Sequence, residues 1–135
     1  MLSMVFVMVT LANESAHRIV EVLKEESSLK NPEEPVYEVA DGSIDFENVI
    51  FSYSKKAKRK ALADINLHIR SGETIGIIGG TGSSKSSLVQ LIPRLYDATE
   101  GTVKVGGLDV KNYDIEALRN QVAVVLQKNI LFSGS

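Results

Sequence analysis

The hydrophobic pattern of residues 1–30 predicts one long helix. Residues 1–12 are strongly apolar and carry no charge, and after Asn13 apolar side chains recur at helical spacing. This apolar stripe consists of Ala16, Ile19, Val20 and Leu23. An apolar run of 12 residues is shorter than the roughly 20 that a membrane-spanning helix needs. Two interpretations remain open, the end of a transmembrane helix that begins earlier or an ordinary buried helix.

A change of pattern after this helix predicts a domain boundary. Residues 31–35 contain two prolines and two acidic residues, which end the helix and begin a linker over residues 31–42. Apolar and polar residues then alternate over residues 43–53, which predicts a strand with a bend near Asn48. Residues 62–69 have the pattern of a return strand, so the two segments together predict a hairpin.

The second half of the chain alternates between strand and helix patterns, which is typical of an α/β fold. Two apolar runs without alternation, residues 74–78 and 122–126, predict parallel strands that are buried on both faces. The helix expected after the first run has Pro93 near its end, which should weaken its last turn. The core stripe of this helix is Leu88, Leu91, Ile92 and Leu95. A short strand at residues 102–105 and a short helix at residues 115–121 precede the second run.

The composition narrows the possible functions without identifying one. The 135 residues include 15 basic and 17 acidic side chains, so the overall charge does not favour a nucleic acid partner. The basic run at residues 55–60 contains no aromatic residue, and we interpret it as a solvated hairpin loop rather than a nucleic acid site. The chain has no cysteine, which excludes disulfides and thiolate chemistry.

Residues 75–87 have the order of a strand, a glycine-rich loop and a helix. The phosphate-loop spacing G-x-x-x-x-G-K-[ST] begins at Gly79 and ends at Lys85 and Ser86. A lysine at this place reaches the β- and γ-phosphates of a nucleotide, and the following hydroxyl is a ligand of Mg²⁺. The candidate nucleotide-binding residues of the loop are Gly79, Gly80, Thr81, Gly82, Ser83, Ser84, Lys85, Ser86 and Ser87. The alternative, a plain Gly/Ser turn, is disfavoured by the strand and helix patterns on either side.

Ser84 stands where the motif has its last glycine, and we expect it to weaken nucleotide binding without abolishing it. The glycine of the motif lies where the backbone crowds the phosphates. If this position requires a positive φ, a serine is strained by about 1–3 kcal/mol, which corresponds to roughly ten- to a hundredfold in affinity. If it does not, serine is tolerated and its hydroxyl is free to contact a phosphate oxygen.

Several longer motifs follow one another along the chain. They are ANESAHRIVEVL, IDFENVIFSY, ALADINLHIRSGETIGIIGGTGSSKSSL, GTVKVGGLDV and VAVVLQKNILFSGS. In this order they resemble the ATP-binding cassette (ABC) exporters, at the junction of the last transmembrane helix and the nucleotide-binding domain. The resemblance implies an α/β fold, part of a P-loop NTPase with an antiparallel β subdomain and a preceding N-terminal helix. It assigns residues 1–30 to the end of the transmembrane helix and its cytoplasmic extension, 31–42 to the linker, and 43–135 to the first part of the nucleotide-binding domain.

The resemblance also implies roles for individual residues. Tyr53 matches the aromatic residue that stacks on adenine, and residues 79–87 match the Walker A loop that binds ATP. Gln127 matches the glutamine that touches Mg²⁺ and the attacking water, so it is the catalytic candidate and, with Ser86, a metal ligand. Each has a plainer interpretation, because Tyr53 suits an ordinary strand aromatic and Gln127 an ordinary polar strand end.

Other motifs of the family do not occur in these 135 residues, namely the LSGGQ-type signature, the Walker B acids and the switch histidine. The chain is therefore expected to be the first half of one nucleotide-binding domain. The resemblance implies a second nucleotide-binding domain as partner, a transmembrane domain, and a location at the cell membrane with the nucleotide-binding part on the cytoplasmic side. Two functions remain open: ATP-driven export of a substrate that the sequence does not identify, or a truncated nucleotide-binding remnant without catalysis.

Overall fold

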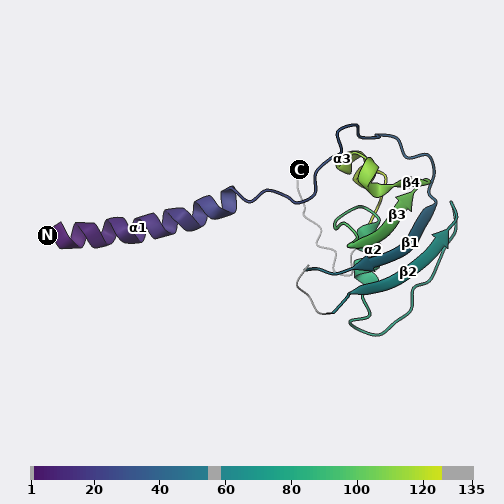
Figure 1. Ribbon diagram of the computed structural model, residues 1–135, viewed down its shortest axis with the longest axis horizontal. Helices are drawn as coiled ribbons and strands as arrows, with labels where there is room; N and C mark the ends of the chain where they lie inside the picture. Colours follow the sequence, from purple (N-terminus) through teal and green to yellow (C-terminus); the bar gives the residue numbers. More distant parts are fainter. Residues whose placement is uncertain (1, 55–58, 126–135) are drawn as a thin grey trace, which may run out of the picture.

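The computed structural model describes residues 2–54 and 59–125 (Figure 1). Its elements are the helix α1 (Leu2–Leu23), the strands β1 (Ile44–Phe51) and β2 (Leu62–Ile69), the helix α2 (Lys85–Leu91), the strands β3 (Glu100–Val105) and β4 (Leu108–Asp109), the 3₁₀ turn η1 (Val110–Asn112) and the helix α3 (Ile115–Asn120). Gln127, the catalytic candidate, and Leu126, the last residue of the second apolar run, lie outside the described residues.

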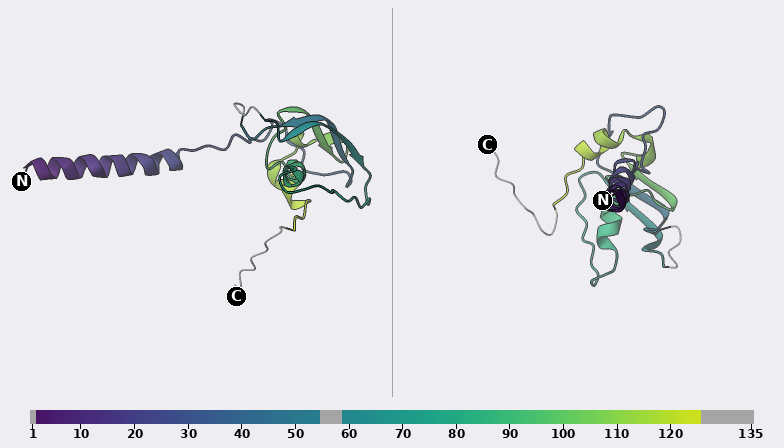
Figure 2. Two further views of the ribbon diagram at one scale, coloured as in Figure 1. Left: turned by 90° about the horizontal axis from the view of Figure 1, so that it is seen from below. Right: turned by 90° about the vertical axis from the view of Figure 1, so that its left-hand side faces the viewer.

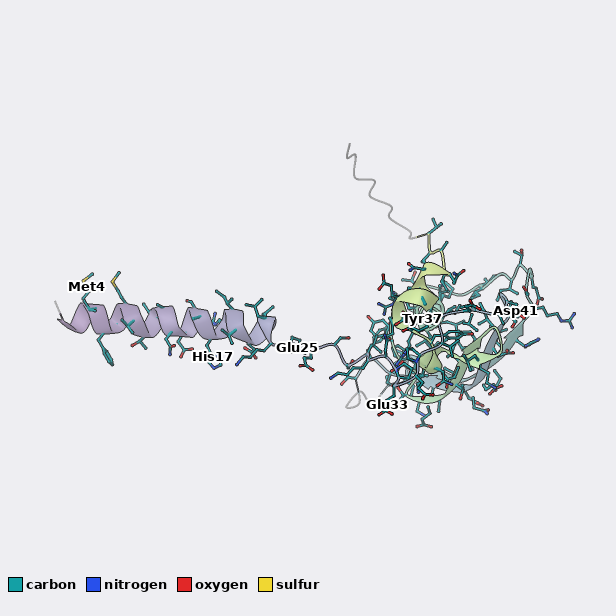
Figure 3. The ribbon with its side chains drawn as sticks, turned by 90° about the horizontal axis from the view of Figure 1, so that it is seen from above. Met4, His17, Glu25, Glu33, Tyr37 and Asp41 are labelled. Atoms are coloured by element: carbon teal, nitrogen blue, oxygen red, sulfur yellow. The ribbon has the colours of Figure 1, made fainter. Side chains whose placement is uncertain are left out.

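The helix α1 extends away from the folded part of the chain (Figures 1 and 2). A helix is confirmed here, but it ends at Leu23 and not at the prolines of residues 31–35. Its apolar stripe contacts no core, since the side chains of Ile19, Val20 and Leu23 are all exposed. Figure 3 shows Met4 and His17 projecting from opposite sides of this helix. The interpretation as an ordinary buried helix is therefore wrong for the described residues. No helix in residues 2–54 and 59–125 combines the length and the apolar character that a membrane span requires.

The linker after α1 lies against the folded part rather than hanging free. Val36 donates its backbone N–H to the carbonyl of Asn112 at 2.9 Å, and its own carbonyl accepts from the N–H of Asp114 at 2.9 Å. The Asn31 side chain accepts from the backbone N–H of Ile115 at 3.0 Å and donates to the Asp114 carboxylate. These bonds attach the chain upstream of the sheet to the start of α3.

The four strands form one antiparallel sheet in the order β2-β1-β3-β4. The predicted hairpin is confirmed, since β1 pairs with β2 from Ile44 opposite Ile69 to Phe51 opposite Leu62. The predicted bend is confirmed too: the register shifts after Phe46, and Asn48 has a φ of 49°. The backbone N–H of Asn48 is satisfied by the Asn66 side chain at 2.9 Å, which stabilises the bulge.

One face of this sheet carries the hydrophobic core. Figure 2 shows α2 and α3 on the same side of the sheet, where Leu91 and Leu118 are both fully buried among side chains from β1 and β3. Tyr113 is buried with them, and its hydroxyl donates to the carbonyl of Val105 at 2.8 Å. Burial, together with the negative charge of Asp41, raises the pKa of Tyr113.

The two predicted parallel strands are not formed in the described residues. Residues 74–78 and 122–125 have no strand structure and are largely exposed, with Ile78 99 % and Val125 85 % accessible. A parallel strand needs a neighbouring strand to satisfy its backbone groups, and no described strand lies beside either run. The prediction that these two runs are buried parallel strands is therefore wrong for the described residues, which contain no partner strand beside either run.

The helix after the loop is shorter than its apolar stripe. It ends at Leu91, two residues before Pro93, because proline lacks the N–H that a further turn would use. Arg94 then turns the chain with a φ of 50°, and its buried guanidinium contacts Asp97 at 2.9 Å and the carbonyl of Lys30 at 3.2 Å. Leu95, expected in the core stripe, is exposed because it follows this turn.

Candidate functional site

The loop of residues 79–84 leads into the N-terminus of α2, as the motif requires. Ser83 donates its backbone N–H to the carbonyl of Gly80 at 3.3 Å, and the N–H of Leu88 bonds to the carbonyl of Ser84 at 3.1 Å as the helix begins. Gly82 has a φ of +81°, a conformation that glycine adopts without strain. Gly79 has little room beside it, since a Cβ there would lie 2.6 Å from the Ser83 Oγ. The glycines of the motif are thus used for turning and for close approach.

Lys85 folds its side chain back over this loop. Its ammonium donates to the carbonyls of Gly79 at 2.6 Å and Gly80 at 2.9 Å, and to the Ser83 hydroxyl at 3.1 Å. These are neutral acceptors, so the positive charge of Lys85 is not cancelled by them. An anionic phosphate placed at the loop would offer the ammonium a charged acceptor, which makes a stronger hydrogen bond.

Ser84 has a left-handed backbone, with φ 60° and ψ 23°, directly before α2. The position therefore adopts the positive φ that the sequence left as one of two possibilities. A non-glycine residue in this region is strained by roughly 1–2 kcal/mol because Cβ approaches the carbonyl oxygen. The geometry explains why the motif has glycine there.

Tyr53 lies at the start of α2, as its proposed role requires. Its hydroxyl forms a 2.7 Å hydrogen bond with the Ser87 hydroxyl, which connects the end of β1 to the first turn of the helix. Its ring meets those of Phe51 and Tyr96 edge to face, or nearly so, at centroid distances of 4.8 and 5.3 Å. Tyr53 is 58 % exposed, which leaves surface for a planar ligand to stack on.

For the other predicted site residues that it describes, the structure gives a position but no contact that indicates a role. Thr81 is exposed on the loop, and Ser86 is exposed in the first turn of α2. Gln127 lies outside the described residues, so the structure does not test whether it approaches Ser86. The site that the structure describes therefore consists of the loop, Lys85 and Tyr53, the aromatic residue just after β1.

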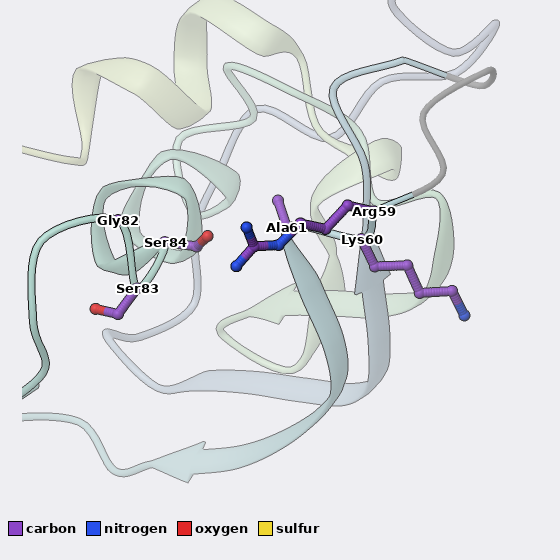
Figure 4. Close-up of a pocket in the computed structure, with 6 residues that line it drawn as sticks. All are labelled: Arg59, Lys60, Ala61, Gly82, Ser83 and Ser84. Atoms are coloured by element: carbon purple, nitrogen blue, oxygen red, sulfur yellow. The ribbon is translucent and has the colours of Figure 1, made fainter.

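Three residues near the site were missed by sequence reasoning. Tyr96 packs against Tyr53, a contact between distant segments that no local pattern reveals. Arg59 and Lys60 line a hollow of about 330 Å³ together with loop residues, whereas the sequence assigned them to a solvated turn (Figure 4). The sequence signal for Arg59 and Lys60 was their position a few residues after Tyr53. A residue so close in sequence to Tyr53 is expected to lie near the same site.

A phosphate-binding loop between an antiparallel sheet and a helix defines this chain as part of a P-loop nucleotide-binding protein. Residues 62–135 match the family model described as ABC transporter, and the chain belongs to that family. Membership of this family implies ATP binding. The resemblance inferred from the ordered motifs is thereby confirmed, as is the partial P-loop fold with its antiparallel sheet and N-terminal helix.

Among its relatives is the uncharacterised ABC transporter ATP-binding protein YknV of Bacillus subtilis, 40 % identical over 90 % of this chain and 20 % of that protein. Another is the putative multidrug export ATP-binding/permease protein YgaD of the same organism, 46 % identical over 68 % of this chain and 16 % of that protein. This chain spans about a fifth or less of the length of these curated relatives.

A solved structure shows the same arrangement. The structure of a bacterial Atm1-family ABC exporter with ATP bound superimposes with a TM-score of 0.78, covering 98 % of this chain and 23 % of that one, at 26 % identity. The match includes the N-terminal helix, since it covers almost the whole chain.

Proposed function

We propose that the chain is the ATP- and Mg²⁺-binding part of an ABC exporter that couples ATP binding and hydrolysis to transmembrane export. The observation that carries the proposal is the meeting of three features at the start of α2: the glycine-rich loop, the Lys85 ammonium above it, and the Tyr53 hydroxyl on Ser87. A nucleotide needs these features together, because its phosphates and its base must be held at the same time.

The roles follow from the chemistry of each group. Lys85 binds the β- and γ-phosphates, and Tyr53 stacks on the adenine. Mg²⁺ prefers oxygen ligands, and the exposed hydroxyl of Ser86 in the first turn of α2 suits it. When bound, this ion neutralises charge on the phosphates. Gln127 is the remaining candidate, for the metal and for the attacking water.

The partners follow from the relatives that carry both ATP-binding and permease parts. We assign residues 1–30 to the end of a transmembrane helix and its cytoplasmic extension, since the apolar side chains of α1 are exposed. Residues 31–42 are the linker and 43–135 the first part of the nucleotide-binding domain. A second nucleotide-binding domain and a transmembrane domain complete the transporter at the cell membrane, with this domain on the cytoplasmic side.

A catalytically inert nucleotide-binding remnant is the second candidate, and one observation favours it. Ser84 has a left-handed backbone at the place of the motif's glycine, which strains the loop. The two candidates agree that the loop binds ATP and differ in whether a longer chain turns it over.

Binding of Mg-ATP to the full 135-residue chain tests the shared claim. Lys85→Ala should weaken binding at least about tenfold, because it removes hydrogen bonds to charged oxygens. Lys24→Ala, which removes the same charge at the end of α1, is the matched control and should leave the Kd unchanged. Equal binding by the Lys85→Ala and Lys24→Ala chains would contradict the proposal. The two candidates are separated by phosphate release from a chain that also carries the signature and Walker B motifs.

A further inference from the structure

A hollow of about 330 Å³ lies beside the phosphate loop, on the side that faces the hairpin between β1 and β2. One wall consists of loop residues Gly82, Ser83 and Ser84, and the other of Arg59, Lys60 and Ala61. Figure 4 shows the Arg59 guanidinium directed into the hollow, towards the Ser84 side chain. The Lys60 ammonium points away from it in the same view.

The charged residues that line this hollow are both positive. No carboxylate is among its lining residues, and within residues 2–54 and 59–125 the Arg59 guanidinium has no hydrogen-bond or ion-pair partner. The opposite wall offers serine hydroxyls, which are neutral. A cation without a counter-charge next to a phosphate loop favours an anionic ligand over a neutral one.

Arginine is suited to a phosphate ligand in particular. Its planar guanidinium presents several N–H donors that match two phosphate oxygens at once, whereas lysine offers a single point charge. Lys85 already lies over Gly79 and Gly80, near the beginning of the loop. Arg59 approaches the end of the loop at Ser84, so the two cations act on different parts of one phosphate chain.

We propose that Arg59 is a further nucleotide-binding residue, which contacts the phosphate chain of the nucleotide from the hairpin after Tyr53. This inference rests on the proposed function, because it needs a nucleotide in the loop. Tyr53 and Arg59 then belong to one segment, so that the end of β1 and the turn after it hold the base and the phosphates together. Affinity should depend on Arg59 more strongly as the number of phosphates increases.

The test compares Arg59→Ala and Arg59→Lys with Lys60→Ala, the neighbouring cation whose side chain points away from the hollow. The full chain is titrated with Mg-ATP, ADP and AMP, and thermal melting confirms that each variant is folded. Arg59→Ala should weaken Mg-ATP binding about tenfold, as expected for a hydrogen bond between charged groups. Arg59→Lys should lose less, Lys60→Ala should change the Kd less than twofold, and AMP should be the least affected ligand.

The outcomes separate this inference from the proposed function. If Lys85→Ala abolishes binding while Arg59→Ala equals Lys60→Ala, Arg59 has no role and the proposed function stands. If Arg59→Ala weakens ATP and AMP equally, the guanidinium does not act on the phosphate chain and the inference is overturned. If the unaltered chain binds no Mg-ATP, the proposed function fails and the inference fails with it.

Discussion

The antiparallel sheet and the two apolar runs outside it have the same kind of side chains and opposite environments. Phe46, Val49 and Val103 are buried in the sheet, whereas Ile78 and Val125 lie almost fully in solvent. The difference is in the partners available to each segment. Each strand of the sheet pairs with a described strand, while residues 74–78 and 122–125 have no strand beside them.

This comparison shows what hydrophobicity does and does not specify. A hairpin brings its own partner within a few residues, so a local pattern is enough to predict both strands. A parallel strand depends on a distant partner, and its apolar sequence indicates burial without supplying the surface that buries it. The same substitution should therefore have different consequences in the two regions.

The largest contrast is expected between Leu118→Ala and Ile78→Ala. Leu118 is fully buried, and truncating a buried leucine destabilises a fold by about 2–5 kcal/mol through lost contacts and the cavity left behind. Ile78 is 99 % exposed, so its truncation should change the free energy of unfolding by no more than about 0.5 kcal/mol. Chemical denaturation of both variants checks this. A large effect at Ile78 would mean that the run is covered in solution.

A smaller contrast is expected inside the sheet region, between Gly101→Ala and Gly107→Ala. Both glycines have nearly the same positive φ, +79° and +78°, so the backbone strain of alanine is equal. A Cβ on Gly101 would meet the backbone carbonyls of Asn48 and Glu47 at the bulge of β1, while one on Gly107 would meet nothing within 4 Å. We expect losses of about 2–3 kcal/mol and about 1 kcal/mol, since overpacking adds to the strain only at Gly101. Equal shifts of Tm would argue against the close approach at the bulge.

The features that the sequence predicted are those with a local signal, and the features that it missed are contacts between distant segments. The hairpin, its bend at Asn48 and the short helix after Tyr113 were predicted, because the apolar and polar patterns behind them are local signals. The phosphate loop was predicted because its spacing is fixed by the ligand. The approach of Arg59 to the loop and the contact of Tyr96 with Tyr53 were not, because they depend on how distant segments fold together. The attachment of the linker through Asn31 was missed for the same reason, since the prolines indicated only a break.

Asn31→Ala tests whether the linker belongs with the sheet or with the exposed runs. Asn31 accepts from the N–H of Ile115, one of the free donors at the start of α3, so its loss should cost about 1 kcal/mol. Asn120→Ala, at the other end of α3, is the matched control, because no side-chain bond of Asn120 is found among the described residues. It should change the free energy of unfolding by less than about 0.5 kcal/mol. Thermal unfolding measures both. If the two variants unfold at the same temperature, the hydrogen bond of Asn31 does not stabilise the attachment of the linker.

An effect of similar size, on binding and not on stability, is expected in the loop itself, where Ser84 has a strained backbone in an otherwise exposed segment. Because residues 71–83 before it are exposed, the loop without nucleotide is free to relax and relieve the left-handed conformation. The strain then falls mainly on the nucleotide-bound state, which needs the loop in one shape. Ser84→Gly should therefore strengthen Mg-ATP binding about five- to tenfold, corresponding to roughly 1 kcal/mol of relieved strain.

Ser84→Ala is the control for this prediction, because alanine keeps the Cβ and the strain and removes only the hydroxyl. If strain is the cause, the alanine chain should bind Mg-ATP as the serine chain does, and only the glycine chain should bind more tightly. If the hydroxyl contacts a phosphate, the alanine chain should bind more weakly than the serine chain. Tighter or equal binding by the serine chain relative to the glycine chain would show that the left-handed backbone at Ser84 does not limit nucleotide binding.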